Sequence, residues 1–315
     1  MRRDIRQATV VITGASSGIG RAAARAFAAQ GARLVLAARR QAALQEVAAE
    51  CVRAGAQAVV VPTDVTDAPA VAELARSASG SCGGRIDVWI NNAGVGAVGT
   101  FEQVPIETHD QVIRVNLLGY LHGAHAALPY FKRQASGVLI NNISLGAWAP
   151  TPYSVAYSAS KFGLRGYSEA LRAELRRWPN IHVCDLFPAF IDTPGFQHGA
   201  NYTGREIRPG PGVCPPERVA EAMVALARRP RRAMSVGATA QLARFVHFAL
   251  GDHANRLFER ALHAYLQRAP AAASGDGTLF EPNAELTTVS GGWRARRSIV
   301  QRVRKAAWRD GVQHG

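Results

Sequence analysis

The chain of 315 residues has few cysteines, almost no lysine and no long hydrophobic run. Its four cysteines lie far apart and form no CxxC pair, which argues against a zinc site and a disulfide framework and favours a reducing cytosol. No apolar run approaches the ~20 residues that a transmembrane helix needs. The first residues run directly into a strand-like stretch and leave no room for a secretory leader, so we expect a cytoplasmic protein.

The composition predicts a globular protein with an excess of positive charge. Hydrophobic residues make up 48% of the chain and charged residues 19%, a balance that is not typical of disordered proteins. The formal net charge is +14, which suggests a nucleic acid, an anionic membrane or a phosphorylated ligand as a partner. The last 25 residues hold seven basic residues and one acidic residue, so part of this charge belongs to a tail.

Short apolar runs alternate with helical patterns over the first 240 residues. Strands are predicted at 8–12, 33–37, 58–61, 86–90, 138–143, 181–187 and 233–237, and helices at 19–30, 41–54, 68–79, 107–134, 155–177 and 216–228. This alternation predicts an α/β fold, a doubly wound parallel seven-stranded sheet of Rossmann type, as one domain at 1–240. A helical extension is predicted at 241–269. Residues 270–315 are predicted to be a flexible linker followed by a basic tail.

A glycine-rich turn follows the first predicted strand, where residues 13–20 read TGASSGIG and a helix is predicted to begin. Glycines let the backbone approach a diphosphate, and the helix N-terminus adds free N–H groups and the positive end of its dipole. The alternative is an ordinary tight turn. The first strand–helix junction of an α/β chain is, however, the context that this motif requires. The turn therefore predicts a nucleotide site.

Later motifs continue this pattern. Asp64 and Val65 follow the third predicted strand, NNAG at 91–94 follows the fourth, and Ser144 ends the fifth. YSASK at 157–161 begins the next helix, and PAFIDT at 188–193 follows the sixth strand. In order and spacing, these motifs resemble the short-chain dehydrogenase/reductase family over about residues 8–240. One departure is Ala189, where the family usually has glycine; its methyl group adjusts the nicotinamide site but removes no catalytic group.

Tyr157 and Lys161 are four residues apart, so a helix places them on one face. A cation close to a tyrosine favours the phenolate, which makes the pair a plausible acid and base for interconverting a carbonyl and an alcohol. The alternative for Tyr157 alone is a surface tyrosine. The family resemblance implies that Ser144 holds the substrate oxygen and Tyr157 exchanges the proton. It also implies that Lys161 lowers the tyrosine pKa and binds the ribose hydroxyls, while Asn116 holds a water that links Lys161 to solvent.

The end of the second predicted strand indicates the cofactor. NAD sites of this type place a carboxylate there to bind the ribose 2′-hydroxyl, whereas this chain has Ala38 followed by Arg39 and Arg40. An arginine binds a 2′-phosphate in a bidentate manner, so NADP(H) is expected over the alternative of a solvated arginine pair. The cofactor-binding residues expected from these motifs are Gly14, Ser16, Ser17, Gly18, Ile19, Gly20, Arg39, Arg40, Asp64, Val65, Asn92, Ala93, Gly94, Tyr157, Lys161, Pro188, Ile191 and Thr193.

Other features point to partners. His122 and His125 have no third ligand nearby in sequence, so no metal site is expected. The resemblance implies a homodimer or homotetramer that forms through helices 107–134 and 155–177. Aromatic residues that flank the catalytic segments suggest an apolar alcohol or ketone as substrate. As a helix, residues 293–309 would be basic and amphipathic, and they could contact an anionic membrane peripherally, dock on the domain or be disordered.

Three functions remain open from the sequence. The first is an NADP(H)-dependent oxidoreductase that acts on CH–OH groups. The second is a regulatory protein that binds the cofactor without catalysis; such proteins typically lose the tyrosine or lysine, and this chain has both. The third is a nucleic-acid-binding protein, but no RNA- or DNA-binding motif is recognisable, so no nucleic-acid partner is expected.

Overall fold

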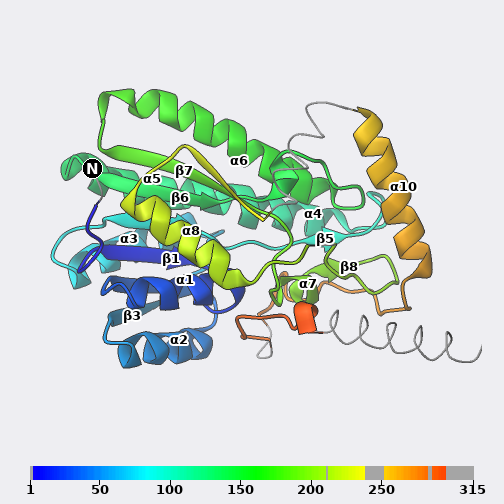
Figure 1. Ribbon diagram of the computed structural model, residues 1–315, viewed down its shortest axis with the longest axis horizontal. Helices are drawn as coiled ribbons and strands as arrows, with labels where there is room; N and C mark the ends of the chain where they lie inside the picture. The colour runs from blue at the N-terminus through cyan, green and yellow to red at the C-terminus, as the bar shows by residue number, and fades with distance from the viewer. Residues whose placement is uncertain (1–2, 211, 238–251, 283–285, 296–315) are drawn as a thin grey trace, which may run out of the picture.

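The computed structural model describes residues 3–210, 212–237, 252–282 and 286–295. Seven strands form one parallel sheet in the order β3-β2-β1-β4-β6-β7-β9 (Figure 1). They are β1 (Thr9–Thr13), β2 (Arg33–Ala38), β3 (Gln57–Pro62), β4 (Val88–Asn91), β6 (Gly137–Asn142), β7 (Ile181–Pro188) and β9 (Ala233–Val236). The predicted fold class is confirmed, and each predicted strand is found within two residues of its expected ends.

Helices cover both faces of this sheet. The first layer contains α1 (Gly18–Ala28), α2 (Gln41–Arg53) and α8 (Pro216–Arg228), and the second contains α3 (Ala68–Ser81), α5 (Gly119–Arg133) and α6 (Val155–Glu174). Successive residues of β1 enter opposite cores: Val10 and Ile12 pack under the first layer and Val11 under the second. Strands that are buried on both faces are therefore continuously apolar, which is the pattern that made them predictable.

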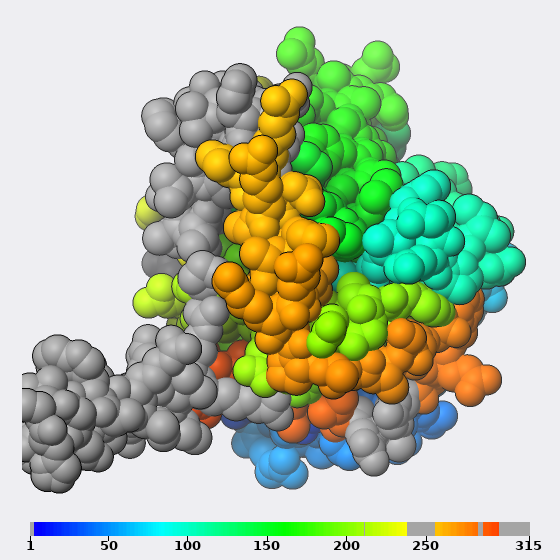
Figure 2. All heavy atoms as spheres, turned by 90° about the vertical axis from the view of Figure 1, so that its right-hand side faces the viewer, coloured from blue at the N-terminus to red at the C-terminus, as the bar shows by residue number. Residues whose placement is uncertain are grey.

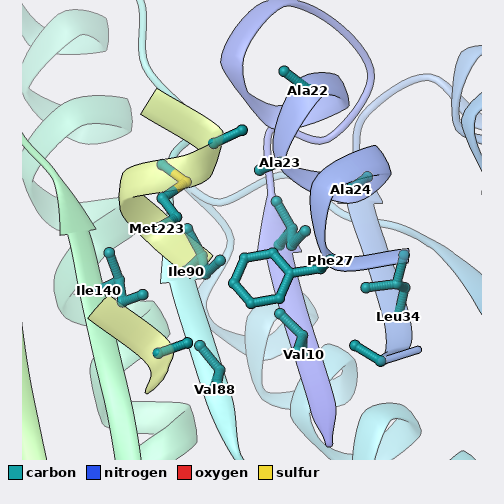
Figure 3. Packing of buried hydrophobic residues seen from close by; sticks show 14 of the residues in the cluster. Val10, Ala22, Ala23, Ala24, Phe27, Leu34, Val88, Ile90, Ile140 and Met223 are labelled. Carbon is teal, nitrogen blue, oxygen red and sulfur yellow. The ribbon is translucent and has the colours of Figure 1, made fainter. Parts of the chain in front are cut away.

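The core under α1 and α8 is closely packed. Phe27 lies fully buried between the helix and the sheet, next to Val10, Leu34 and Ile90 (Figure 3). Small residues of α1, Ala23 among them, let the helix lie close to its neighbours. Truncating a buried phenylalanine of this kind to alanine costs about 3–5 kcal/mol. This core fixes the start of α1, and with it the glycine-rich turn.

The helix predicted at 107–134 is divided into three parts. These are α4 (Ile106–Ile113), a π-helical turn η1 (Arg114–Leu118) and α5. The apolar periodicity continues through the interruption, so sequence spacing did not reveal it. Further short elements also went unpredicted: β5 (Ala97–Val98), β8 (Ala200–Asn201), the 3₁₀ turns η2 (Leu145–Ala147) and η3 (Leu175–Arg177), and α7 (Gly195–His198).

The C-terminal part begins with α10 (Asp252–Arg268), inside the predicted helical extension; residues 241–251 lie outside the described part of the chain. Residues 270–282 and 286–292 contain no regular helix or strand. Instead of separating two units, as a flexible linker would, they hydrogen-bond to the domain at many points. The predicted basic helix at 293–309 falls outside the described residues except for its first three. Trp293 is buried, so it does not face solvent. Within the described residues, no helix is long and apolar enough to span a bilayer.

Candidate active site

A cavity of about 250 Å³ lies at the carboxyl ends of the strands, where the order of the sheet reverses between β1 and β4. Ligands bind at this position in open α/β sheets. Thirteen of the expected cofactor residues line the cavity: Gly14, Ser16, Ser17, Gly18, Ile19, Arg39, Arg40, Asp64, Val65, Asn92, Ala93, Gly94 and Thr193. Ala38, which the sequence placed at the ribose, lines it too. Residues that sequence reasoning missed also line it: Thr63, Val95, Val115, Asn142, Pro194, Gly195, His198, Gly199, Thr278 and Pro282.

The glycine-rich turn is held by close backbone contacts. Gly14 and Gly18 have φ angles of +64° and +51°, which favour glycine. A Cβ atom on Gly20 would lie 2.0 Å from the carbonyl oxygen of Gly14. Gly20 therefore shapes the turn from beneath, although it was expected to line the site and does not.

Asn92 fastens this turn to the end of β4. Its side-chain amide donates to the carbonyl oxygens of Thr13 at 3.0 Å and Gly14 at 3.2 Å, and its own oxygen accepts from the Asn142 amide at 2.9 Å. The backbone N–H of Asn92 donates to the Thr13 hydroxyl at 3.0 Å. Asn92 thus acts mainly as a brace that keeps the floor of the cavity rigid. Asn142, which ends a strand without any motif, was not predicted.

Asn116 lies in the π-helical turn. Its side chain bonds both polar atoms of the Val95 backbone at 2.8 Å, with its oxygen accepting from the N–H and its amide donating to the carbonyl. Turns of this kind in helices are frequent at functional sites because they redirect one side chain. Here the turn joins α4 and α5 to the segment after β4, which lines the cavity.

Tyr157 and Lys161 lie on the first turns of α6, directly beside the cavity wall. The Lys161 Nζ atom lies 5.4 Å from the centre of the Tyr157 ring and 5.2 Å from that of Tyr120. It is also 3.8 Å from where a Cβ atom on Gly94 would stand. The Tyr157 ring and the Ser144 hydroxyl lie side by side: a Cβ atom on Gly146 would stand 3.1 Å from the ring and 3.5 Å from Oγ of Ser144. The structure therefore brings together the four predicted catalytic residues, since Asn116 Oδ1 lies 3.4 Å from the same Cβ position on Gly94.

Burial has the largest effect on the pKa values of Lys161 and Tyr157. The Lys161 side chain is 3% exposed, and its ammonium forms no hydrogen bond or ion pair within the described residues, so burial lowers its pKa to about 7. Burial also raises the pKa of Tyr157, opposed by the Ser144 side chain. Burial therefore has the largest effect on the Tyr157 pKa in the protein without cofactor, and the lowering of this pKa by Lys161 stays a prediction. The lysine itself loses much of its charge, because nothing anionic accompanies it.

The two arginines after β2 differ in their surroundings. The guanidinium of Arg39 donates to three backbone carbonyl oxygens, those of Thr278 at 2.8 Å, Leu279 at 3.1 Å and Phe280 at 2.7 Å. The Arg40 side chain has no hydrogen bond or ion pair in the described structure; burial lowers its pKa, opposed by the charge of Glu46 and aided by that of Arg39. The bidentate contact expected of Arg39 is thus restricted to its remaining N–H groups. Arg40 has more side-chain N–H donors left for a ligand.

Two buried polar atoms on the cavity wall lack a protein partner in the described structure. They are Oδ1 of Asn142 and Nε2 of His198. Solvent reaches neither atom, so neither argues for a ligand. The free N–H groups of the glycine-rich turn, the Arg40 side chain and the unpaired ammonium of Lys161 beside the cavity fit a polar, anionic ligand. A phosphorylated dinucleotide has the hydroxyl and phosphate groups that this surface requires.

Some expected residues lie elsewhere. Besides Gly20, Tyr157, Lys161, Pro188 and Ile191 are not part of the cavity wall. The described residues include no group of three metal-ligating side chains. The ring of His122 bonds the Val65 carbonyl oxygen at 2.9 Å, which gives it a structural role.

Comparison with known proteins identifies the family of this chain. The family model for short chain dehydrogenases matches residues 8–201. The chain is 31% identical over 309 residues to a Bacillus subtilis protein, Uncharacterized oxidoreductase YxnA, covering 96% of this chain and 86% of that protein. It is 38% identical over 183 residues to an uncharacterized oxidoreductase of Staphylococcus aureus, covering 58% of this chain and 78% of that protein.

Solved structures show the same architecture. An alcohol dehydrogenase from the archaeon Thermococcus sibiricus, complexed with 5-hydroxy-NADP, is similar with a TM-score of 0.65 and 29% identity. A metagenomic short-chain oxidoreductase in complex with NADP gives a TM-score of 0.63 and 30% identity. Each covers 74% of this chain and 97% of its own. Since the family model spans more than half of the chain and the site geometry accompanies it, the protein belongs to the short-chain dehydrogenase/reductase family of oxidoreductases.

Proposed function

We propose that the protein is an NADP(H)-dependent oxidoreductase that interconverts a carbonyl and a secondary alcohol. The observation that carries this proposal is the buried, unpaired ammonium of Lys161, one helical turn from Tyr157 and beside the dinucleotide cavity. A buried, unpaired ammonium lowers the stability of the folded protein, and such a group is retained where a ligand or a reaction uses it. A nucleotide with ribose hydroxyls is the ligand that completes it.

The roles of the residues follow from their positions. When bound, the nicotinamide supplies or accepts the hydride. Tyr157, whose raised pKa keeps it protonated at neutral pH, donates a proton to the carbonyl oxygen during reduction. Ser144, next to Tyr157, holds the same oxygen. Lys161 orients the ribose and stabilises the phenolate that forms, and Asn116, fixed by Val95, keeps the path from Lys161 to solvent in place.

The charge around the ribose site supports NADP(H) over NAD(H). Ala38 stands where a carboxylate would bind the 2′-hydroxyl, and Arg39 and Arg40 line the cavity next to it. Both solved relatives described above carry NADP or a derivative of it. We assign the 2′-phosphate mainly to Arg40, with the remaining N–H groups of Arg39 assisting.

The substrate is proposed to be a small apolar ketone or alcohol, and the assembly a homodimer or homotetramer. Exposed apolar side chains at the start of α6 and in η1, Val155 and Leu118, support a subunit contact on these elements. Sedimentation velocity on the purified protein measures the assembly.

The test of function is a panel of ketones and alcohols assayed with both cofactors, following the absorbance of reduced nicotinamide. Turnover of at least one substrate pair, faster with NADP(H), is the expected result. Tight NADPH binding with no turnover of any substrate would instead favour a regulatory protein that binds the cofactor without catalysis.

A further inference from the structure

Two C-terminal segments are called the strap here: residues 276–282, of which Thr278 and Pro282 line the dinucleotide cavity, and residues 286–293, which hydrogen-bond to elements around it. One side of the strap is bound to the wall formed by α7 and β8. The Thr278 N–H donates to the His198 carbonyl oxygen at 2.9 Å. At Gly277, whose φ is +59°, a Cβ atom would lie 2.3 Å from that same oxygen. The strap backbone therefore lies directly against this wall.

The other side of the strap is bound to the opposite wall. Arg39 donates to the three carbonyl oxygens of residues 278–280, as described above. The N–H of Gly18, the first residue of α1, donates to the Thr288 carbonyl oxygen at 3.0 Å. Arg21 donates to the neighbouring carbonyl oxygen of Thr287 at 2.8 Å. Free N–H groups at a helix start are the groups that bind anions, so the strap engages the nucleotide-binding turn itself.

The end of the strap holds the segment after β7. The Trp293 N–H donates to the Asp192 carboxylate at 2.8 Å, and its indole N–H donates to the Thr193 carbonyl oxygen at 3.0 Å. Its ring packs edge-on against Phe196, with 6.2 Å between ring centres. Thr193 lines the cavity, so this contact fixes part of the cavity wall.

An apolar anchor secures the first segment of the strap. Leu279 is 1% exposed and packs in a cluster with Ala97, Val104 and Val112, against which Tyr157 also packs. Its neighbour Phe280 is 43% exposed. In Figure 2, the orange segment after α10 runs as a band between yellow-green atoms of the 190–210 region and blue atoms of the first strand–helix units.

We propose that the strap is the outer wall of the NADP(H) site, and that the dinucleotide leaves only after the strap detaches from one of the two walls. Thr278 and Pro282 line the cavity, so the strap roofs the site without filling it. Arg39 is oriented for the 2′-phosphate by carbonyl oxygens of the strap. The proposal rests on the cofactor assignment made above.

The residues that the strap contacts distinguish an outer wall of the NADP(H) site from a C-terminal segment that only covers the surface. The strap contacts are made by groups of the nucleotide site: the first amide of α1, the arginine after β2 and the segment around Thr193. A segment that only added buried area would have no reason to select them. Closing segments that span both walls of a site commonly make ligand release their own slow step.

The test compares two adjacent strap residues. Full-length protein is saturated with NADPH and mixed with excess NADP⁺, and the loss of bound-NADPH fluorescence gives the dissociation rate constant. Leu279→Ala removes the buried anchor and is expected to speed dissociation about tenfold, equivalent to ~1.4 kcal/mol. Phe280→Ala, which removes an exposed ring from the same strap, is expected to leave the rate within about twofold.

A second pair of variants, at two glycines, tests the same rate in case Leu279→Ala does not fold. Gly277→Ala forces the strap away from the His198 carbonyl oxygen and is expected to speed release, whereas Gly275→Ala, with open space at its Cβ position, is not. Equal rates for all folded variants, or slower release from Leu279→Ala and Gly277→Ala, would overturn the strap's role and leave the proposed function intact. Failure of the wild-type protein to bind NADPH would overturn both.

Discussion

Lys161→Met is expected to make the protein without cofactor more stable while it loses function. Folding buries the Lys161 side chain to 3% exposure and lowers its pKa from 10.5 to about 7. The unfolded chain therefore binds the proton more tightly than the folded protein. This difference corresponds to about 5 kcal/mol of lost stability below pH 7, since one pKa unit is worth about 1.4 kcal/mol. Methionine has similar length and no charge, and replacing buried ionic groups by apolar ones stabilises proteins by about 1–4 kcal/mol.

The pH dependence gives the sharper test. Between the folded pKa of about 7 and the unfolded value of 10.5, the unfolded state holds more protons at this site, so wild-type stability rises with pH over this range. The advantage of Lys161→Met should be greatest below pH 7 and shrink toward pH 10. Urea unfolding of both proteins without cofactor, at several pH values, measures it. The contributions of other groups that titrate in this range cancel when the unfolding free energy of one protein is subtracted from that of the other.

The matched control for this prediction is Lys132→Met. The Lys132 side chain is 40% exposed and lies 3.9 Å from Glu174. Its loss should change stability by less than about 0.5 kcal/mol at any pH. A Lys161→Met protein that is less stable than wild type at pH 7, or whose difference from wild type does not vary with pH, would refute the reasoning.

Two further substitutions test the cofactor site. Ala38→Asp with Arg40→Leu should lower the preference for NADP over NAD by about 10²-fold, because it removes charge-assisted bonds to the 2′-phosphate and adds a repulsive carboxylate. Arg39 keeps its contacts with the carbonyl oxygens. Binding titrations with both cofactors measure the preference, and Arg53→Leu, which removes an exposed arginine of α2, is the control for net charge. An unchanged preference would count against the Arg40 assignment. Gly20→Ala places a Cβ atom 2.0 Å from the Gly14 carbonyl oxygen and should weaken NADPH binding at least about tenfold by displacing the turn. Gly166→Ala, in α6 with open space around it, should bind NADPH normally, and equal affinities for the two glycine variants would contradict the close packing of the turn.

The fold was readable from the sequence because its central strands are buried on both faces. Runs such as residues 34–37 are continuously apolar, and the helices between them keep a regular stripe. The π-helical turn at 114–118 was not readable, because its extra residue leaves the apolar spacing of the flanking helices intact. The two-residue strands β5 and β8 are too short to carry any periodicity.

The parts of the candidate site that could be predicted contain a residue type that is rare in this chain or one that the backbone conformation requires. Glycines at a strand–helix junction and a rare lysine four residues after a tyrosine identified two of its parts. The contribution of Thr278 and Pro282 could not be predicted, because they come from a stretch that reads as a loop and reach the cavity only through tertiary contacts. Sequence spacing likewise gives the cation next to Tyr157 but not the burial, which raises the pKa of Tyr157 and lowers that of Lys161.

The most direct test of the proposed reaction is single-turnover hydride transfer by Tyr157→Phe. The protein is loaded with NADPH and mixed with the best ketone from the substrate panel, and the loss of reduced-nicotinamide absorbance is followed. The substitution removes only the phenolic hydroxyl, so NADPH should bind with unchanged affinity. The transfer rate should fall by about 10²–10⁴-fold, as expected for loss of the acid. A rate within a few-fold of wild type, with normal NADPH binding, would contradict the assignment of Tyr157 as the proton donor.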